Sequence, residues 1–482
     1  MHVARAVPLT FLMTLLLLAM AGTAVAQTTA PAPAPQAAPA DSALTDPPAD
    51  PQLFSEEWIQ NTKQPVDWFK WGADLRLRDE YRRNAITLDE SAPANEYNYG
   101  RYRTRAWSTI TPVKDLDFNS RIAWEFRNFC RPKGEHTGPL EDIRSTNWDE
   151  AIIDNLNVKW SNALGAPATL TVGRQDIKLD DGWLVFEGTP LDGSRTVFYD
   201  AARLNYNFEQ AKTVLDLIYI EQSANSDQWI EPFNDQERLL VEQDQRAAVF
   251  HVANKSIENT ELDGYFIFQK NMAENFPSGV ESNIYAYGGR VVHQFDEHWR
   301  ARAEMAQELG HKNFEDLCAL GFNSRLSYFV NDEWNNNFRL SYEFLSGDDP
   351  DTETNEEFDP LWGRWPQWSE LMVYAYAGET RVGYITNLHR VGPGWSFNPT
   401  KKFEVCADYY LLFADENTFA GRSGFSSGGD FRGQLLALLL QYTFNPHVKT
   451  HFVSEFLFPG NYYDEPRGDT AMFMRYELMF TW

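Results

Sequence analysis

One alternating pattern of side chains limits what this chain can fold into, and it recurs from Trp71 almost to the last residue. Segments of about ten residues switch between apolar and polar side chains, and polar loops separate them. In "DLDFNSRIAWEFR", for example, Phe118 and Trp124 fall on one face, and Asn119 and Arg121 fall on the other. A period of two is that of a β-strand with one apolar face. The sequence therefore predicts an all-β protein built from many long strands.

Composition separates two ways of using such strands. Aromatic residues make up 15% of the 482 residues, yet the mean hydropathy is −0.48. A soluble β-sandwich or propeller would bury the aromatic faces against another sheet, whereas a barrel in a membrane would turn them to lipid and keep a polar interior. The missing propeller repeats and long acidic loops such as "DDPDTETNEEFDP" favour the barrel. We predict a closed transmembrane antiparallel β-barrel of about 18 strands, preceded by a signal peptide and a disordered linker.

The N-terminal region carries a secretion signal. Arg5 precedes the apolar run "LTFLMTLLLLAM", and "AVA" at 24–26 has the small residues that signal peptidase needs. We assign residues 1–26 to the signal peptide, 27–65 to a Pro/Ala-rich periplasmic linker, and 66–482 to the barrel. Beyond the signal no stretch of about 18 apolar residues occurs, so the sequence predicts no membrane-spanning helix. These features place the protein in the outer membrane of a diderm bacterium.

The final segment "AMFMRYELMFTW" alternates up to Trp482. A closed barrel has no free edge, so its last strand must pair with its first. We expect Arg475 and Glu477 to face the pore, and we expect this strand to be recognised by the barrel-insertion machinery. The opposite face should meet lipid, and it comprises Met472, Met474, Tyr476, Leu478, Phe480 and Trp482.

Motifs for catalysis or for metal binding are missing from the sequence. HExxH, GxxxxGK[ST] and GxSxG do not occur, and no histidine pair has metal-ligand spacing. The acidic loop "GDDPDTETNEE" lacks the ligand spacing of an EF-hand, so we expect it to be a solvated loop. The net charge of −27 opposes binding to nucleic acid. We therefore predict no enzyme activity, no cofactor and no metal site.

Arginines alternate with the apolar residues of these strands, so they should share the inner face of the barrel. The planar guanidinium binds carboxylates through two hydrogen bonds, which suits a pore that passes an anionic solute. Internal salt bridges are the alternative, because acids such as Asp74, Glu80, Glu125 and Glu477 should face the same lumen. The predicted pore-lining residues are Arg76, Arg78, Arg103, Arg105, Arg121, Arg127, Arg174, Arg203, Arg302, Arg325 and Arg339.

Several motifs resemble those of the alginate-export family of outer-membrane barrels. Two of them are "VGRQDIKLDDGWLVF" at Val172–Phe186 and "YDAARLNY" at Tyr199–Tyr206. A third is the "SGDDPD" loop that leads to Phe358–Leu361. The fourth resembles the family's closing strands and reads "GQLLALLLQYTFNPHVKTHFVSEFLFPGNYY", including the Phe-x-Pro-Gly ending at Phe458–Gly460. The likeness covers roughly Trp71 to Trp482. It implies a monomeric barrel of about 18 strands whose narrow, arginine-lined pore secretes an anionic uronate polymer.

The resemblance also assigns individual residues. It carries pore arginines onto Arg174 and Arg203, and onto the "RLR" and "RTR" arginines at 76, 78, 103 and 105. One strand departs from the family pattern, because "GQELD" here reads "GQLLA", with Leu435 and Ala437 in place of two acids. The inner wall should therefore be locally apolar at these two positions.

Together these observations predict an outer-membrane porin or exporter that passes an anionic solute by diffusion. The resemblance implies a uronate polysaccharide such as alginate. A general diffusion porin without polymer specificity is the alternative, and a barrel enzyme or a surface adhesin is the alternative from another class. The expected partners are outer-membrane lipid and an anionic saccharide or small anion, with the chain acting as a monomer.

Overall fold

The computed structural model describes residues 55–93, 95–131, 136–138, 141–143, 146–186, 198–226, 230–241, 244–272 and 281–482. The predicted signal peptide and most of the predicted linker lie outside these residues. The long strands are β1 (Phe69–Arg83), β2 (Glu96–Val113), β3 (Leu116–Arg131), β6 (Thr146–Trp160), β7 (Ala168–Gln175), β8 (Tyr199–Phe208), β9 (Thr213–Gln222), β10 (Gln245–Asn254), β11 (Thr260–Asn271), β12 (Ser282–Gln294), β13 (Trp299–Lys312), β14 (Glu315–Phe329), β15 (Asn337–Leu345), β16 (Leu388–Thr400), β17 (Phe403–Phe413), β18 (Phe431–Asn445), β19 (Val448–Pro459) and β20 (Ala471–Thr481).

Short elements complete the described chain. Strands β4 (His136–Gly138) and β5 (Glu141–Ile143) pair only with each other. The helices are α2 (Glu56–Lys63) and α3 (Leu371–Ala375), with 3-10 turns η1 (Ala163–Gly165), η2 (Glu209–Ala211) and η3 (Tyr376–Gly378). Among the described residues, no helix has both the length and the apolar character needed to cross a membrane.

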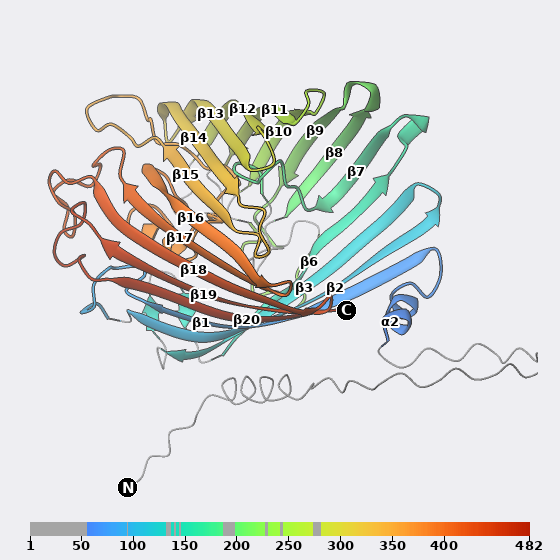
Figure 1. The fold of residues 1–482 in the computed structure, drawn as a ribbon, viewed down its shortest axis with the longest axis horizontal. Helices are drawn as coiled ribbons and strands as arrows, with labels where there is room; N and C mark the ends of the chain where they lie inside the picture. Colours follow the sequence, from blue (N-terminus) through green and yellow to red (C-terminus); the bar gives the residue numbers. More distant parts are fainter. Residues whose placement is uncertain are drawn as a thin grey trace, which may run out of the picture. The chain divides into compact units, whose positions relative to one another are not determined.

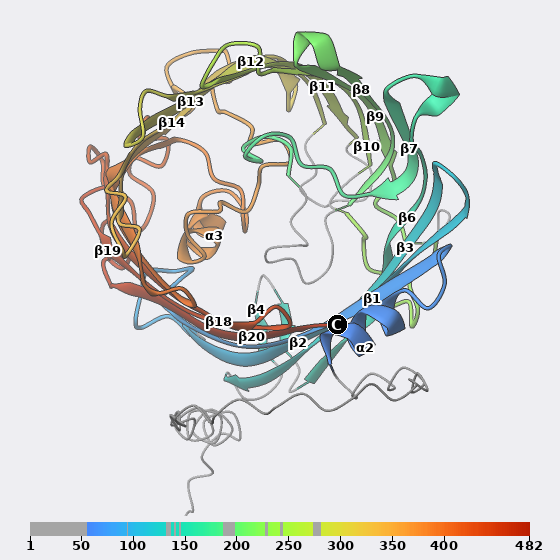
Figure 2. The same ribbon diagram turned by 45° about the vertical axis from the view of Figure 1, so that its right-hand side comes forward.

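The long strands form one closed antiparallel barrel. In the described chain, 18 strands make a single sheet, and each of them is hydrogen-bonded to the strand on either side. The sheet closes where β1 pairs with β20, with Leu77 opposite Leu478 and Arg78 opposite Glu477. Figure 1 shows the barrel from the side, and Figure 2 looks into the ring of strands. The barrel predicted from the alternating pattern is therefore confirmed.

Alternation along each strand separates an outer face from an inner one. On β10, Phe250 is 47% exposed on the outer wall, whereas its neighbour Val249 is 3% exposed on the inner wall. On β20, Arg475 and Glu477 are buried on the inside, and Phe480 is among the exposed apolar side chains. The outer wall is thus apolar and aromatic, and the inner wall carries most of the charged side chains.

The two ends of the barrel differ. At the short-turn end, two-residue turns such as 114–115, 401–402 and 446–447 join neighbouring strands. At the long-loop end the connections include 346–387, 414–430 and 460–470. Two segments from this end turn into the barrel: residues 176–186, the short inward loop, and residues 346–387, the long inward loop. Figure 2 shows α3, which belongs to the long inward loop, inside the ring of strands.

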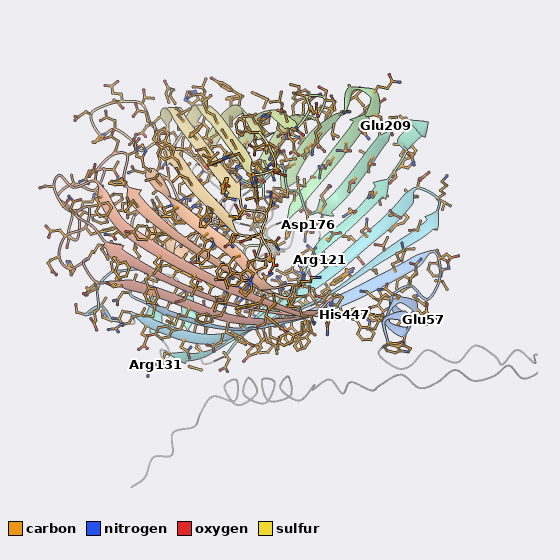
Figure 3. The ribbon with its side chains drawn as sticks, in the orientation of Figure 1. Glu57, Arg121, Arg131, Asp176, Glu209 and His447 are labelled. Carbon is orange, nitrogen blue, oxygen red and sulfur yellow. The ribbon has the colours of Figure 1, made fainter. Side chains whose placement is uncertain are left out.

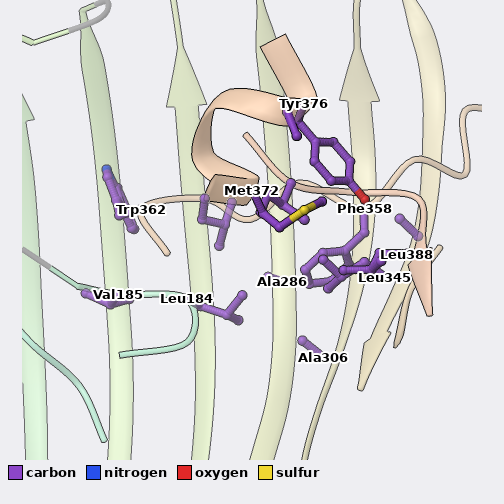
Figure 4. Close-up of a cluster of buried hydrophobic side chains, with 14 of the residues drawn as sticks. Leu184, Val185, Ala286, Ala306, Leu345, Phe358, Trp362, Met372, Tyr376 and Leu388 are labelled. Carbon is purple, nitrogen blue, oxygen red and sulfur yellow. The ribbon is translucent and has the colours of Figure 1, made fainter. Parts of the chain in front are cut away.

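An apolar core forms inside the barrel, where the inward loops meet the wall. Leu184 and Val185 come from the short inward loop, and Phe358 and Met372 come from the long one (Figure 4). They pack against small and branched side chains of the inner wall, namely Ala286, Ala306, Leu345 and Leu388. Because apolar side chains are removed from water here, the two loops are held within the lumen as a packed layer.

Helix α2 occupies the last part of the segment predicted to be a linker. The Ser55 hydroxyl accepts a hydrogen bond from the Trp58 backbone N–H at 3.2 Å, which caps the helix at its N-terminus. The Trp58 ring then packs edge-on against Trp482, with ring centroids 5.3 Å apart. Trp71 also stacks on Trp482, with ring centroids 6.4 Å apart. The helix is therefore fixed beside the junction between β1 and β20.

Candidate functional site: a cavity in the barrel lumen

A cavity of about 500 Å³ lies between the two inward loops and the barrel wall. Pockets that hold drug-sized molecules have volumes of about 300–1,000 Å³, so a solute of that size would fit. The inward loops contribute three tryptophans: Trp183, Trp365 and Trp368. The wall contributes Arg302, Arg325, Arg339, Arg390, Tyr410, Glu455 and Arg475. Aromatic rings and guanidinium groups thus surround the same space.

Arg325 is the arginine of this cavity whose positive charge is least neutralised by neighbouring acids. Its side chain is exposed, and in the described part of the chain no carboxylate forms an ion pair with it. Arg302 lies directly opposite it on β13, and Ser341 lies opposite it on β15. Arg339, farther along β15, donates hydrogen bonds to Asp408 and to the Ser396 hydroxyl, both at 2.9 Å. Arg325 is therefore the arginine best placed to bind an anion.

Arg390 is held rigidly in the cavity wall. Its guanidinium donates to Glu343 from Nε at 3.1 Å and pairs with it from Nη2 at 3.0 Å. Trp368 and Tyr410 each place a ring centroid 4.6 Å from the same guanidinium. The side chain is 3% exposed, and its Nη1 is buried without a hydrogen-bond partner among the described residues. Glu343 and the two aromatic rings therefore fix Arg390 in the wall of the cavity.

The two inward loops are joined to each other. The Trp183 indole N–H donates to Glu343 at 3.0 Å, and its ring stacks on Phe358 with centroids 5.7 Å apart. The backbone N–H of Trp362 donates to the Leu184 carbonyl at 3.1 Å. A Cβ on Gly363 would lie 1.7 Å from the Trp183 carbonyl oxygen, so only glycine allows this approach. The two inward loops therefore form one continuous structure that narrows the lumen at the cavity.

Charged side chains of the wall anchor the long inward loop. Arg432 on β18 pairs with Glu379 through hydrogen bonds of 2.8 and 2.6 Å, and both side chains are almost fully buried. Glu455 on β19 accepts from the Ser369 hydroxyl at 2.5 Å and from the backbone N–H groups of Glu370 and Leu371 at the start of α3. Arg475 on β20 pairs with Glu370 at 2.8 Å. Three neighbouring strands thus fix the position of α3.

Ion pairs also attach the short inward loop. Asp181 pairs with Arg302 at 2.6 Å and with Arg290 at 3.2 Å. Burial raises the pKa of Asp181, but these two arginines outweigh it and hold the pKa below the ordinary value of 3.8. Asp176, at the start of the loop, pairs with Arg121 at 2.7 Å, and Figure 3 labels both residues. The loop is therefore attached by charge at neutral pH.

The predicted arginines of the first strands form a buried network with acids. Arg76 donates to Glu125 at 2.8 Å, and Arg78 donates to Glu477 at 2.8 Å across the β1–β20 junction. Arg103 is fully buried, and its register neighbours are Arg76 on β1 and Glu125 on β3. Glu125 and Glu477 therefore neutralise part of the positive charge in this wall, although Arg76 stands directly opposite Arg103 and Arg78 directly opposite Arg101.

Five of the other predicted arginines are also paired with acids. Arg174 additionally places its guanidinium 3.9 Å from the Phe198 ring centroid. The acidic partners within 4.0 Å are Asp74 for Arg105, Asp154 and Asp176 for Arg121, Glu125 for Arg127, Asp200 for Arg174, and Asp216 for Arg203. Of the eleven predicted residues, only Arg302, Arg325 and Arg339 line the cavity.

Other cavity residues did not follow from the alternating pattern. Arg390 is followed within four residues by "GPG", and this interrupts the alternation that marks an inner face. Trp183, Trp365 and Trp368 lie in loops, where no period assigns a side to a residue. For Trp365 and Trp368 the sequence signal is only a local cluster of tryptophans, "LWGRWPQW", between two strands.

One group of side chains has the chemistry of metal ligands. Ligand atoms of Asp180, His251 and Asp263 all lie within 4.8 Å of one another. The Arg290 guanidinium is 2.8 Å from Asp263 and 3.5 Å from Asp180, so it already neutralises these carboxylates. The group therefore has the character of a buried salt-bridge cluster.

Known structures share the fold at low sequence identity. OpdQ of Pseudomonas aeruginosa is 12% identical, with 86% of this chain and 98% of that chain covered and a TM-score of 0.54. OccAB4 of Acinetobacter baumannii is 10% identical, with 86% of this chain and 98% of that chain covered and a TM-score of 0.53. OccK3 of P. aeruginosa is 12% identical, with coverage of 89% and 99% and a TM-score of 0.51.

Sequence comparison identifies the family. No curated protein sequence matches the chain. The sequence profile described as alginate export matches residues 67–476, which is nearly the whole barrel. This match confirms the resemblance expected from the strand and loop motifs. The chain therefore belongs to the alginate export family and is a β-barrel porin of the bacterial outer membrane.

Proposed function

We propose that the barrel conducts a carboxylate-bearing solute by passive diffusion, and that a uronate polysaccharide such as alginate is that solute. The observation that carries the proposal is Arg325, whose guanidinium faces the cavity without an acidic partner among the described residues. Weak binding at several sites favours flux, because one tight site would retain the solute.

A general diffusion porin is the second candidate, and two observations favour it. Arg76, Arg78 and Arg101 on β1 and β2 are paired with acids, which removes much of their attraction for an external anion. The wall positions Leu435 and Ala437 are apolar, with Leu435 fully buried against the inward loops. Under this alternative the cavity arginines would only shape the pore, and neutral sugars would pass as readily as uronates.

Reversal potentials in a KCl gradient across planar bilayers test the proposal. The wild-type pore should prefer anions, and Arg325→Ala should shift the preference toward cations. Glucuronate oligomers should block the wild-type current, and Arg325→Ala should weaken that block about tenfold, because a hydrogen bond between charged groups contributes about 1.5–3 kcal/mol. Arg131→Ala is the matched control, because Arg131 is an exposed arginine on β3 that does not line the cavity.

A cation preference of the wild-type pore would refute the anion proposal. Liposome swelling separates the two candidates, because equal rates for neutral sugars and uronates of the same size would support the general porin. The proposed diffusion through the pore needs no bond to be made or broken.

For assembly, we propose that the outer face of β20 is the part that the barrel-insertion machinery recognises.

A further inference from the structure

The outer wall at β9, β10 and β11 has an ordered change in chemistry along its strands. Nearest the long-loop end, Glu221, Arg246 and Lys270 stand opposite one another in one row. The next row toward the short-turn end is Tyr219, Ala248 and Phe268, and the row after it is Leu217, Phe250 and Phe266. A charged row thus lies directly beside two apolar, aromatic rows, as at a membrane interface.

A groove runs through these apolar rows. Its volume is about 340 Å³, and it is lined by Leu170, Ala202, Leu204, Leu217, Ile218, Tyr219, Ala248, Val249, Phe250 and Phe266. Ala202 and Ala248 have the smallest side chains in this lining, whereas Tyr219 and Phe250 are 50% and 47% exposed. Small residues between projecting rings give a narrow apolar channel, which suits a single hydrocarbon chain better than a flat surface would.

The charged row has a surplus of positive charge. Arg246 pairs with Glu221 at 2.9 Å, and Tyr219 donates to the same carboxylate at 2.8 Å. Within the described chain no carboxylate pairs with Lys270, which lies beside Arg246. Two cations and one anion therefore stand above the groove, in a protein whose net charge is −27. Phosphate groups are bound by such pairs of basic side chains.

We propose that the groove and the Arg246–Lys270 pair together bind one phosphorylated, acylated glycolipid of the outer leaflet, the lipid A part of lipopolysaccharide. One acyl chain lies in the groove, and a phosphate lies between the two basic side chains. The long-loop end of an outer-membrane barrel faces the cell exterior, which places the charged row at the outer-leaflet headgroups. The site lies on the outer face of the barrel and shares no lining residue with the cavity, so it is independent of the solute that passes.

Lipid retention by the full-length protein tests this inference. Protein extracted in mild detergent is incubated with bisphosphorylated lipid A, and bound lipid is counted by native mass spectrometry. Wild type should retain one molecule, and Arg246→Ala/Lys270→Ala should weaken retention at least tenfold. Ala248→Phe, which fills the groove without changing charge, should weaken it similarly. Lys255→Ala is the matched control, since Lys255 is exposed at the other end of the β10–β11 hairpin and should leave retention unchanged.

Three outcomes would overturn the inference. One is equal retention by wild type and by the double variant. Another is retention of phosphatidylglycerol as strong as that of lipid A, which would assign the site to glycerophospholipid. The third is a wild-type dimer that dissociates in Ala248→Phe, which would make a second copy of the chain the occupant of the groove. Each variant is checked for a folded barrel by its heat-dependent mobility on gels.

Discussion

Replacing Glu379 by Gln is expected to release the long inward loop from the barrel wall. The change leaves Arg432 buried at 1% side-chain exposure, between the rings of Tyr376 and Tyr462, without a compensating charge. Removing one partner of a buried ion pair costs about 3–5 kcal/mol. Since about 1.4 kcal/mol changes an equilibrium tenfold, the detached state of the loop should gain a factor of about 10² to 4 × 10³ in population.

Single-channel recording measures this effect directly. Glu379→Gln should show a larger conductance with frequent transitions, because the loop that narrows the lumen is no longer fixed to it. The double variant Glu379→Leu/Arg432→Leu is the matched control, since replacing both partners by apolar side chains of similar size restores packing without an unpaired charge. Conductance of Glu379→Gln that equals the wild-type value in size and steadiness would refute the role assigned to this ion pair.

Three further perturbations test other contacts. Because the folded-state pKa of Asp181 is depressed, this residue attaches the short inward loop at neutral pH, and the attachment is lost as the pH falls below about 3.8. The conductance of the wild-type pore should therefore rise in acid. Asp181→Asn should already show the larger conductance at neutral pH. Gly363→Ala should separate the inward loops at Trp183 and widen the pore, whereas Gly468→Ala, whose Cβ would meet nothing within 4 Å, should not. Trp482→Ala should lower barrel stability in urea by about 1–2 kcal/mol through lost ring contacts, with single-channel conductance unchanged.

The fold could be predicted because one physical constraint acts on every strand. Lipid outside and water inside require a period of two, and the period assigns each side chain to a wall face without knowledge of any contact. The inward direction of Arg475 and the outward direction of Phe480 followed from this alone. Helix α2 was not predicted, because its eight residues follow a Pro/Ala-rich stretch and are too short to show a clear helical period.

The cavity could be predicted only in part. The pattern placed Arg302, Arg325 and Arg339 on the inner wall, but it could not show which arginines keep a free guanidinium. Pairing depends on strand register and on loops that fold back, and neither is encoded by the alternation. Arg76 is neutralised by Glu125, which lies two strands away and 49 residues later. Trp183 reaches the cavity only because its loop turns inward.

The anchors of the long inward loop set an order for assembly. The loop precedes β18, β19 and β20 in the chain, and its partners on these strands follow it by 53 residues at Arg432 and by 86 at Glu455. The full attachment of α3 therefore requires that the last three strands have entered the sheet. Closure of the barrel and fixation of this part of the constriction are completed together, and we expect an unfinished barrel to leave the long inward loop open to protease.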